Sequence, residues 1–198
     1  MPGDEARSDI MEATDSELMS RLAAGNDLAL NDLMHRWKDR VASFLFRMTG
    51  QSGTAADLAQ ETFVKLYQAR HRYRPEGKFS TWLFTIAANL GRNQARWKMR
   101  HPTVSLDAAE DSLPALRELM DHGQSPDEAA SSVERFHAIH QAFQELPSDL
   151  RETMSLFIYE DMGYAEIASV IGSSAKAVET RIYRARQILK EKLKNIRS

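Results

Sequence analysis

Residues 62–100 of this 198-residue sequence form a strip of cations with interleaved aromatic rings. A single acid, Glu76, stands against nine Lys or Arg side chains: Lys65, Arg70, Arg72, Arg74, Lys78, Arg92, Arg96, Lys98 and Arg100. Large rings lie among the later cations, at Phe79, Trp82, Phe84 and Trp97. Cations neutralise phosphates and flat rings stack on exposed bases, so this composition is typical of a surface for partly unpaired nucleic acid. The alternative is a solvated basic helix with a few core aromatics.

After a break at residues 74–77, a helix is predicted to begin at Ser80 or Thr81, because either residue can cap it. At about 100° per residue, two amides, two guanidiniums and a Trp share one side of that helix. These side chains are Asn89, Asn93, Arg96, Arg100 and Trp82. Amides and guanidiniums can read base edges and hold phosphates, so the stripe indicates a nucleic-acid contact.

The segment before this strip, residues 57–70, is predicted to be an amphipathic helix. Its apolar positions recur at three- and four-residue spacing and define a buried face: Ala59, Thr62, Phe63, Leu66 and Tyr67. The opposite face carries Asp57, Gln60, Glu61, Lys65 and Gln68. Periodicity does not distinguish a solvated surface from a polar docking patch there.

The last forty or so residues contain two helical segments around a glycine turn. A short helix is predicted over 164–171, a tight turn at Gly172-Ser173, and a second helix from Ser174. The second helix places apolar side chains inward at Val178, Ile182, Ala185 and Leu189. This pattern is typical of a helix-turn-helix, with an unrelated helical hairpin as the alternative. The face left for a major groove comprises Lys176, Thr180, Tyr183, Arg184 and Gln187.

Helical patterns cover the other periodic segments, and none shows strand alternation, so the predicted fold class is all-α. A capping box at residues 14–17 opens a short helix, and a longer helix runs to a stop at Thr49-Gly50. Another helix is predicted to start at residues 125–128 and to end at Pro147. The next helix, capped by Ser148, should face inward with Leu150, Thr153, Met154, Phe157 and Ile158.

Charge is strongly segregated, although the net charge is only −2. Residues 105–134 carry eight acids and one Arg, whereas residues 176–198 carry eight cations and two acids. This pattern predicts two basic domains joined by an acidic connector. We expect a disordered tail over 1–13, a first helical domain over 14–101, a flexible acidic linker over 102–125 and a second domain over 126–198. The linker acids either keep the connector extended or compete with DNA for the basic faces.

Several classes of site are not expected. The chain has no cysteine, which excludes disulfides and thiolate metal sites and fits a reducing cytosol, so we expect a cytoplasmic protein. No apolar run reaches membrane-spanning length, so neither a secretion signal nor membrane insertion is expected. His137 and His140 lie three residues apart but lack a third nearby ligand, so no metal is expected. No nucleophile–base pair or phosphate loop indicates an enzyme or a cofactor.

Two segments resemble known modules of the sigma-70 family. Region 2 of that family is similar to DLAQETFVKLY followed by FSTWLFTIAANLGRNQARW, and region 4 is similar to LPSDLRETMSLFIYEDMGYAEIASVIGSSAKAVETRIYRARQIL. The short length and the absence of an intervening domain resemble the extracytoplasmic-function (ECF) subfamily. The resemblance implies a non-catalytic RNA polymerase sigma factor that binds core polymerase and directs promoter-specific initiation.

The resemblance also implies a role for each matching residue. Docking on the clamp helices of the polymerase β′ subunit would involve Asp57, Gln60, Glu61 and Lys65. Opening and reading the −10 element would involve Arg74, Lys78, Phe79, Ser80, Trp82, Asn89, Arg92, Asn93 and Arg96. Reading the −35 element as duplex would involve Ser174, Lys176, Thr180, Arg181, Tyr183 and Arg184. The expected partners are core polymerase, through the β′ clamp helices and the β flap, promoter DNA, and an anti-sigma factor as a further candidate.

Two positions depart from the family pattern. Ala177 and Glu179 stand where the family often has a hydroxyl and a cation, and Glu179 would repel phosphates. The −35 contacts are therefore left open. A stand-alone helix-turn-helix regulator and an accessory of a nucleic-acid-processing enzyme are the alternative functions. A plain regulator of duplex DNA has no need for a Trp and Arg strip suited to single strands.

Overall fold

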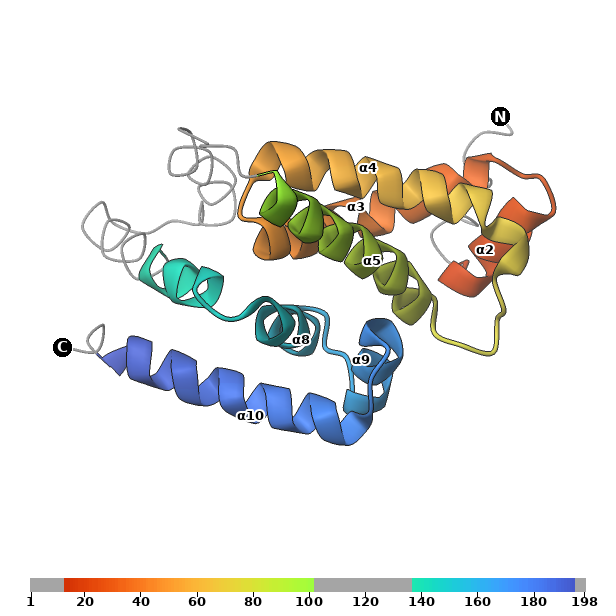
Figure 1. The fold of residues 1–198 in the computed structure, drawn as a ribbon. Coiled ribbons are helices and arrows are strands. Elements are labelled where there is room, and N and C mark those ends of the chain that lie inside the picture. The colour runs from red at the N-terminus through yellow and green to blue at the C-terminus, as the bar shows by residue number, and fades with distance from the viewer. Residues whose placement is uncertain (1–12, 102–136, 195–198) are drawn as a thin grey trace, which may run out of the picture.

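A computed structural model describes residues 13–101 and 137–194, and every regular element in those ranges is helical, which confirms the all-α class (Figure 1). The elements are α2 (Asp15–Ala23), α3 (Leu28–Thr49), α4 (Ser52–Gln68), the 3-10 turn η1 (Arg70–Arg72), α5 (Phe79–Arg100), a helical stretch over 137–144, α8 (Ser148–Tyr159), α9 (Tyr164–Ile171) and α10 (Ala175–Lys192). The predicted linker, the helix start at 125–128 and residues 1–12 of the predicted tail lie outside the described residues.

Helices α2 to α5, within residues 13–101, form the N-terminal bundle around a core rich in aromatic rings. The Phe44 and Phe84 rings meet edge to face with centroids 5.2 Å apart, and both side chains are fully buried. Trp37 contacts Phe84 in the same manner at 6.1 Å. Edge-to-face contacts are a favoured geometry for aromatic pairs, and these three rings join α3 to α5.

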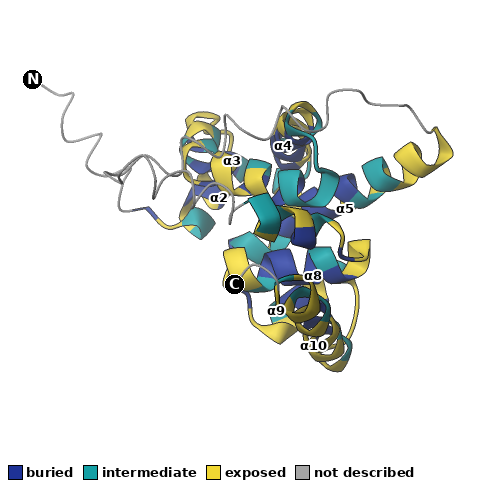
Figure 2. Cartoon of the chain, turned by 90° about the vertical axis from the view of Figure 1, so that its left-hand side faces the viewer, coloured by how far each residue is buried: buried dark blue, intermediate teal, exposed yellow. Residues whose placement is uncertain are grey.

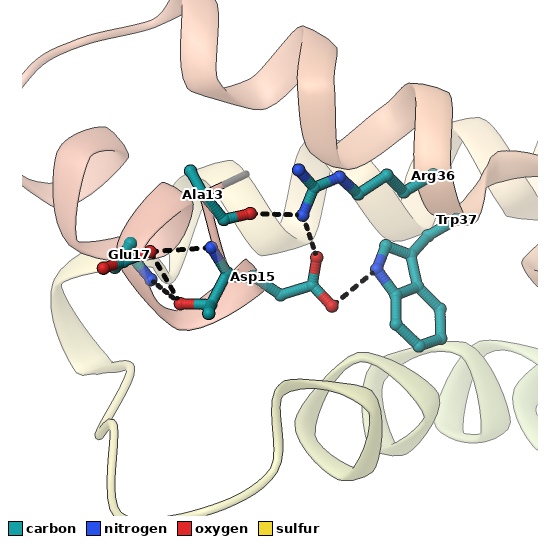
Figure 3. A network of polar contacts seen from close by, with 6 residues as sticks. Ala13, Asp15, Glu17, Arg36 and Trp37 are labelled. Carbon is teal, nitrogen blue, oxygen red and sulfur yellow. Dashed lines mark hydrogen bonds and ion pairs between the residues drawn. The ribbon is translucent and has the colours of Figure 1, made fainter. Parts of the chain in front are cut away.

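A polar network fastens α2 to α3 at one end of the bundle (Figure 3). The capping box predicted at Thr14 is confirmed. The Asp15 carboxylate accepts hydrogen bonds from the Arg36 guanidinium and the Trp37 indole, both at 3.1 Å. Arg36 also donates to the Ala13 carbonyl at 2.6 Å, and Ala13 is buried. Ala13, predicted from the sequence to be part of the disordered tail, therefore belongs to the folded bundle.

Residues 137–194 form the C-terminal bundle, in which α9 and α10 make the predicted helix-turn-helix. Gly172 ends α9 with φ of +65°, and the Ser174 hydroxyl caps α10 by accepting from the Ala177 amide at 3.2 Å. Val178 and Ile182 face inward and are almost fully buried. The predicted turn at Gly172 and the predicted inward face of α10 are thus confirmed.

Gly172→Ala should destabilise the C-terminal bundle by about 1–2 kcal/mol, because an L side chain strains the left-handed backbone. No atom lies within 4 Å of the added Cβ, so the cost is one of backbone conformation alone. Gly163→Ala is the matched control, since Gly163 has φ of −70° and its Cβ would make only ordinary contact with Glu166. Urea unfolding followed by circular dichroism compares the two; equal midpoints would contradict the expectation.

Helix α8 lies on the side of the C-terminal bundle that faces the N-terminal bundle (Figure 2). It packs on α9 and α10 within its own bundle and on α3 of the other. This double burial changes its inward face: Leu156 is fully buried, whereas Ile158, predicted to face inward, is 50% exposed. The periodic pattern predicted one buried face, whereas coverage from two sides also buries Glu152, Ser155 and Leu156, which lie outside the predicted stripe.

Candidate nucleic-acid interface

The predicted amide and guanidinium stripe on α5 is present at the surface. Asn89, Asn93 and Arg96 are exposed, and Arg92 is half-buried. The guanidinium of Arg96 donates to the Asn93 side-chain oxygen at 2.6 Å, and that of Arg92 donates to the Asn89 side-chain oxygen at 2.5 Å. In each pair the amide oxygen accepts the bond, so the amide nitrogen is left to donate elsewhere. The stripe therefore presents both amide and guanidinium N–H donors.

The loop before α5 and the first turns of that helix line a groove of about 710 Å³. Arg74, Lys78 and Trp82, all predicted site residues, line it. The Trp82 ring lies 5.3 Å from the ring of Tyr73, which lines the groove as well. The sequence interpretation omitted Tyr73, although an aromatic residue between Arg72 and Arg74 is a detectable signal for base stacking.

Phe79, which was predicted to contact the −10 element, is buried in the core instead of lying at the surface. Its side chain is only 5% exposed and packs edge to face on Trp37 and Tyr73. Helix α5 begins at Phe79, with Lys78 at the N-cap position and no side-chain capping hydrogen bond, rather than at a cap by Ser80 or Thr81 as expected. Phe79 is therefore a core ring that anchors the loop, and in this structure it cannot stack on a base.

The outer face of α4 is polar and exposed. Asp57, Gln60, Glu61 and Lys65 are all exposed, and the Lys65 ammonium lies 3.3 Å from the Glu61 carboxylate. Val64, which the periodic interpretation did not include, is 53% exposed on the same helix. A single exposed apolar side chain is normal on a protein surface, so Val64 by itself does not mark a binding site.

The outward face of α10 combines cations with an aromatic ring. Lys176, Thr180, Tyr183 and Arg184 are exposed. Three of the predicted −35 residues have an intramolecular role as well: Ser174 caps the helix, Lys176 pairs with Glu179 at 2.8 Å, and Arg181 is half-buried with Asp149 at 3.5 Å. The Lys176 pair offsets the negative charge of Glu179 on this face.

Two cations of the α5 surface are paired with acids of the C-terminal bundle. The Arg92 guanidinium lies 2.5 Å from the Glu152 carboxylate, and the Lys78 ammonium lies 2.7 Å from that of Glu166. Burial raises the pKa of the Glu152 carboxyl, although Arg92 acts in the opposite direction. At Glu166, hydrogen bonds from Lys78 and the Gly163 amide lower the pKa.

His140, one of the two histidines considered as metal ligands, packs against the N-terminal bundle. Its ring stacks on Phe46 with centroids 5.2 Å apart, and burial lowers its pKa. Within residues 13–101 and 137–194, no three His, Cys, Asp or Glu side chains gather as a metal site. Across the same ranges, no helix combines the length and apolar character needed to cross a membrane.

Comparison with known proteins accounts for both bundles. Residues 33–101 match the family described as sigma-70 region 2, and residues 136–189 match that described as sigma-70, region 4. The chain is 31% identical over 189 residues to the RNA polymerase sigma-H factor of Pseudomonas aeruginosa, covering 93% of this chain and 96% of that protein. It is 33% identical over 187 residues to the ECF RNA polymerase sigma-E factor of Escherichia coli K12, covering 92% and 95%.

A solved structure has a similar fold. CnrH, in complex with the cytosolic domain of CnrY, resembles the chain with a TM-score of 0.66 and 27% identity, over 90% of this chain and 96% of CnrH. A stand-alone helix-turn-helix regulator would have no region 2, so that alternative is wrong. The chain belongs to the sigma-70 family, as an ECF sigma factor that directs promoter recognition by RNA polymerase and has no catalytic activity of its own.

Proposed function

We propose that this sigma factor divides promoter recognition between two surfaces: α10 reads the −35 element as duplex, and α5 with its preceding loop captures the −10 strand. The observation that carries the proposal is the presence of two separate exposed faces of different chemistry. The α5 face has amides, guanidiniums and a ring-lined groove, whereas the α10 face has cations on a projecting helix. The predicted domain boundaries belong to this proposal, with Ala13 added to the first domain: 13–101, 102–125 and 126–198.

The α5 surface suits a strand whose bases are unpaired. Trp82 and Tyr73 offer ring faces in the groove, where a base can stack, and Arg74 and Lys78 lie beside it to hold phosphates. The amides of Asn89 and Asn93 can bond base edges that a duplex would conceal. Because such contacts exist only with separated strands, binding here shifts the DNA toward the open state.

The α10 surface suits the major groove, which is wide enough to admit an α-helix. Lys176 and Arg184 supply positive charge, and Tyr183 is 64% exposed beside them. Glu179 is paired with Lys176. Glu179 therefore repels phosphates less strongly than an unpaired carboxylate at the same position would. Arg184 is the exposed guanidinium on this face that is best suited to a bidentate contact with guanine.

We propose three kinds of protein contact. The outer face of α4, including Val64, docks on the clamp helices of the β′ subunit, and the C-terminal bundle contacts the β flap. An anti-sigma factor is the third partner, by analogy with CnrH and the cytosolic domain of CnrY. The protein acts in the cytoplasm, where polymerase and promoter DNA are found.

Arg184→Ala tests the −35 assignment. Loss of one bidentate base contact should weaken closed-complex formation by roughly 1–3 kcal/mol on promoters with an intact −35 element. Arg186→Ala is the matched control, because it removes the same charge from a residue whose guanidinium lies over the Phe157 ring instead. Footprinting of the holoenzyme on intact and scrambled −35 promoters measures both. An equal loss on the two promoters would overturn the assignment.

A further inference from the structure

We propose that Glu179 reads a cytosine of the −35 element, and that it does so together with Lys176 as one unit that contacts a single G·C base pair. The carboxylate accepts a hydrogen bond from the N4 amino group of the cytosine, and the ammonium donates to the guanine of the same pair. This inference rests on the −35 function proposed for α10. It assigns the base specificity of one position to a residue that would otherwise only oppose DNA binding.

Glu179 lies in the part of α10 that is suited to enter the groove. In a helix-turn-helix, residues near the N-terminus of the second helix contact the base edges. Helix α10 begins at Ala175, so Glu179 is on its second turn, three residues after Lys176 and four before Tyr183. Side chains at these spacings are neighbours on one side of a helix. Glu179 and both of these neighbours are exposed, so Glu179 belongs to the outward face.

The paired side chains carry both kinds of hydrogen-bonding group. The Lys176 ammonium donates to the Glu179 carboxylate at 2.8 Å, and the two side chains are 82% and 52% exposed. An ammonium has three donor hydrogens and a carboxylate accepts several bonds, so their mutual bond leaves capacity on both groups. The rest of the chain covers neither group, and both can therefore contact a bound duplex.

The major-groove edge of a G·C pair matches these two groups. Guanine presents N7 and O6 as acceptors, and the N4 donor of cytosine follows beside O6. Lys is a ligand of guanine O6 and N7, and Glu accepts from cytosine N4. An A·T pair also offers donors and acceptors, but its two acceptors are separated by the N6 donor, and the thymine methyl group lies next to O4. The ammonium and carboxylate therefore fit a G·C pair best.

Glu179 is the acceptor best placed for the cytosine bond. Residues 174–184 contain no other carboxylate. The two aliphatic hydroxyls there are already engaged, because that of Ser174 caps the helix and that of Thr180 donates to the Lys176 carbonyl at 3.0 Å. An exposed ion pair contributes little to stability, so helix stability does not account for a carboxylate on a face that must approach phosphates.

Selection of promoter fragments by the holoenzyme tests this assignment. The fragments are randomised across the −35 region, and the duplexes retained in closed complexes at low temperature are sequenced. With the parent protein we expect a strong cytosine preference at one position. Glu179→Gln should convert this preference to adenine, because Gln forms two hydrogen bonds with adenine N6 and N7. Glu179→Ala should reduce discrimination at that position by about tenfold and leave the other positions unchanged.

Lys176→Ala should weaken the preference at the same base pair, because both groups contact it. Glu191→Gln is the matched control, since Glu191 pairs with Lys194 at 2.7 Å with the same three-residue spacing, but at the C-terminal end of α10. This control should select the same sequence as the parent protein. Circular dichroism should be native for every variant, because all of them change exposed side chains.

An unchanged −35 sequence in both Glu179 variants overturns the inference. Equally increased affinity for all sequences overturns it as well, because Glu179 would then only repel phosphates. So does an effect of Lys176→Ala at a different base pair. Arg184→Ala separates these results from a failure of the proposed function. If it also leaves the selected sequence unchanged, α10 does not read the −35 element; if Arg184→Ala alone changes the sequence, only the role of Glu179 is wrong.

Discussion

Glu61→Lys is expected to weaken binding to core RNA polymerase by about a hundredfold, because like charges placed across a protein interface cost several kcal/mol. The Glu61 side chain is 48% exposed, and its nearby partner is Lys65 on the next turn. Reversal therefore creates a doubly positive patch on the proposed docking face. Surface substitutions usually change folding stability by no more than about 0.5 kcal/mol, so the variant should melt like the parent protein.

Glu191→Lys is the matched control for this substitution. It also reverses an exposed acid and removes a helix ion pair, with Lys194 at 2.7 Å, but on α10. Competition against a labelled sigma factor for core polymerase gives both affinities, and circular dichroism gives both melting temperatures. Unaltered core binding by Glu61→Lys would remove the docking assignment, whatever the control does.

Asn93→Ala is expected to reduce promoter opening at least about tenfold, the size of effect that follows from losing one specific base contact. The amide oxygen of Asn93 accepts from Arg96, so its loss also frees that guanidinium from its position on the stripe. Closed-complex formation should be unaffected, because α10 is unchanged. Permanganate reactivity of the −10 strand in the holoenzyme complex measures opening, and footprinting at low temperature measures the closed complex.

Gln94→Ala is the control here, since it removes an amide from the neighbouring, half-buried position on another side of α5. The contrast with Arg184→Ala is equally informative. That variant should lose duplex affinity and retain opening once bound. If Asn93→Ala and Arg184→Ala both lost only duplex affinity, and in equal measure, the proposal of two separate surfaces would be wrong.

Short-range chemistry made much of this protein predictable. The capping box at Thr14, the stop at Gly50 and the turn at Gly172 each depend on atoms only a few residues apart, and all three form as the sequence predicts. The exposure of Asn93 and Arg184 was predictable for a related reason. Each lies opposite the apolar stripe of its own helix, and helical periodicity alone determines that side.

Contacts between distant segments decided what the pattern could not. Phe79 was expected at the surface because it lies among cations, but the ring of Trp37 on α3 provides an apolar site that buries it. Ile158 was expected inside because it fits the α8 stripe, yet α8 is buried on two sides and leaves that position exposed.

The sequence by itself determined the helices, the helix-turn-helix, the family and the chemistry of the three candidate surfaces. Only the tertiary structure decided that Arg92 meets Glu152, 60 residues away, and that Arg40 meets Glu160, 120 residues away. The physical reason is that a helix pattern gives the direction of a side chain relative to its own axis. Which partner the side chain meets depends on how the two bundles pack against each other. The energy of an ion pair depends in turn on how deeply this packing buries the two charges.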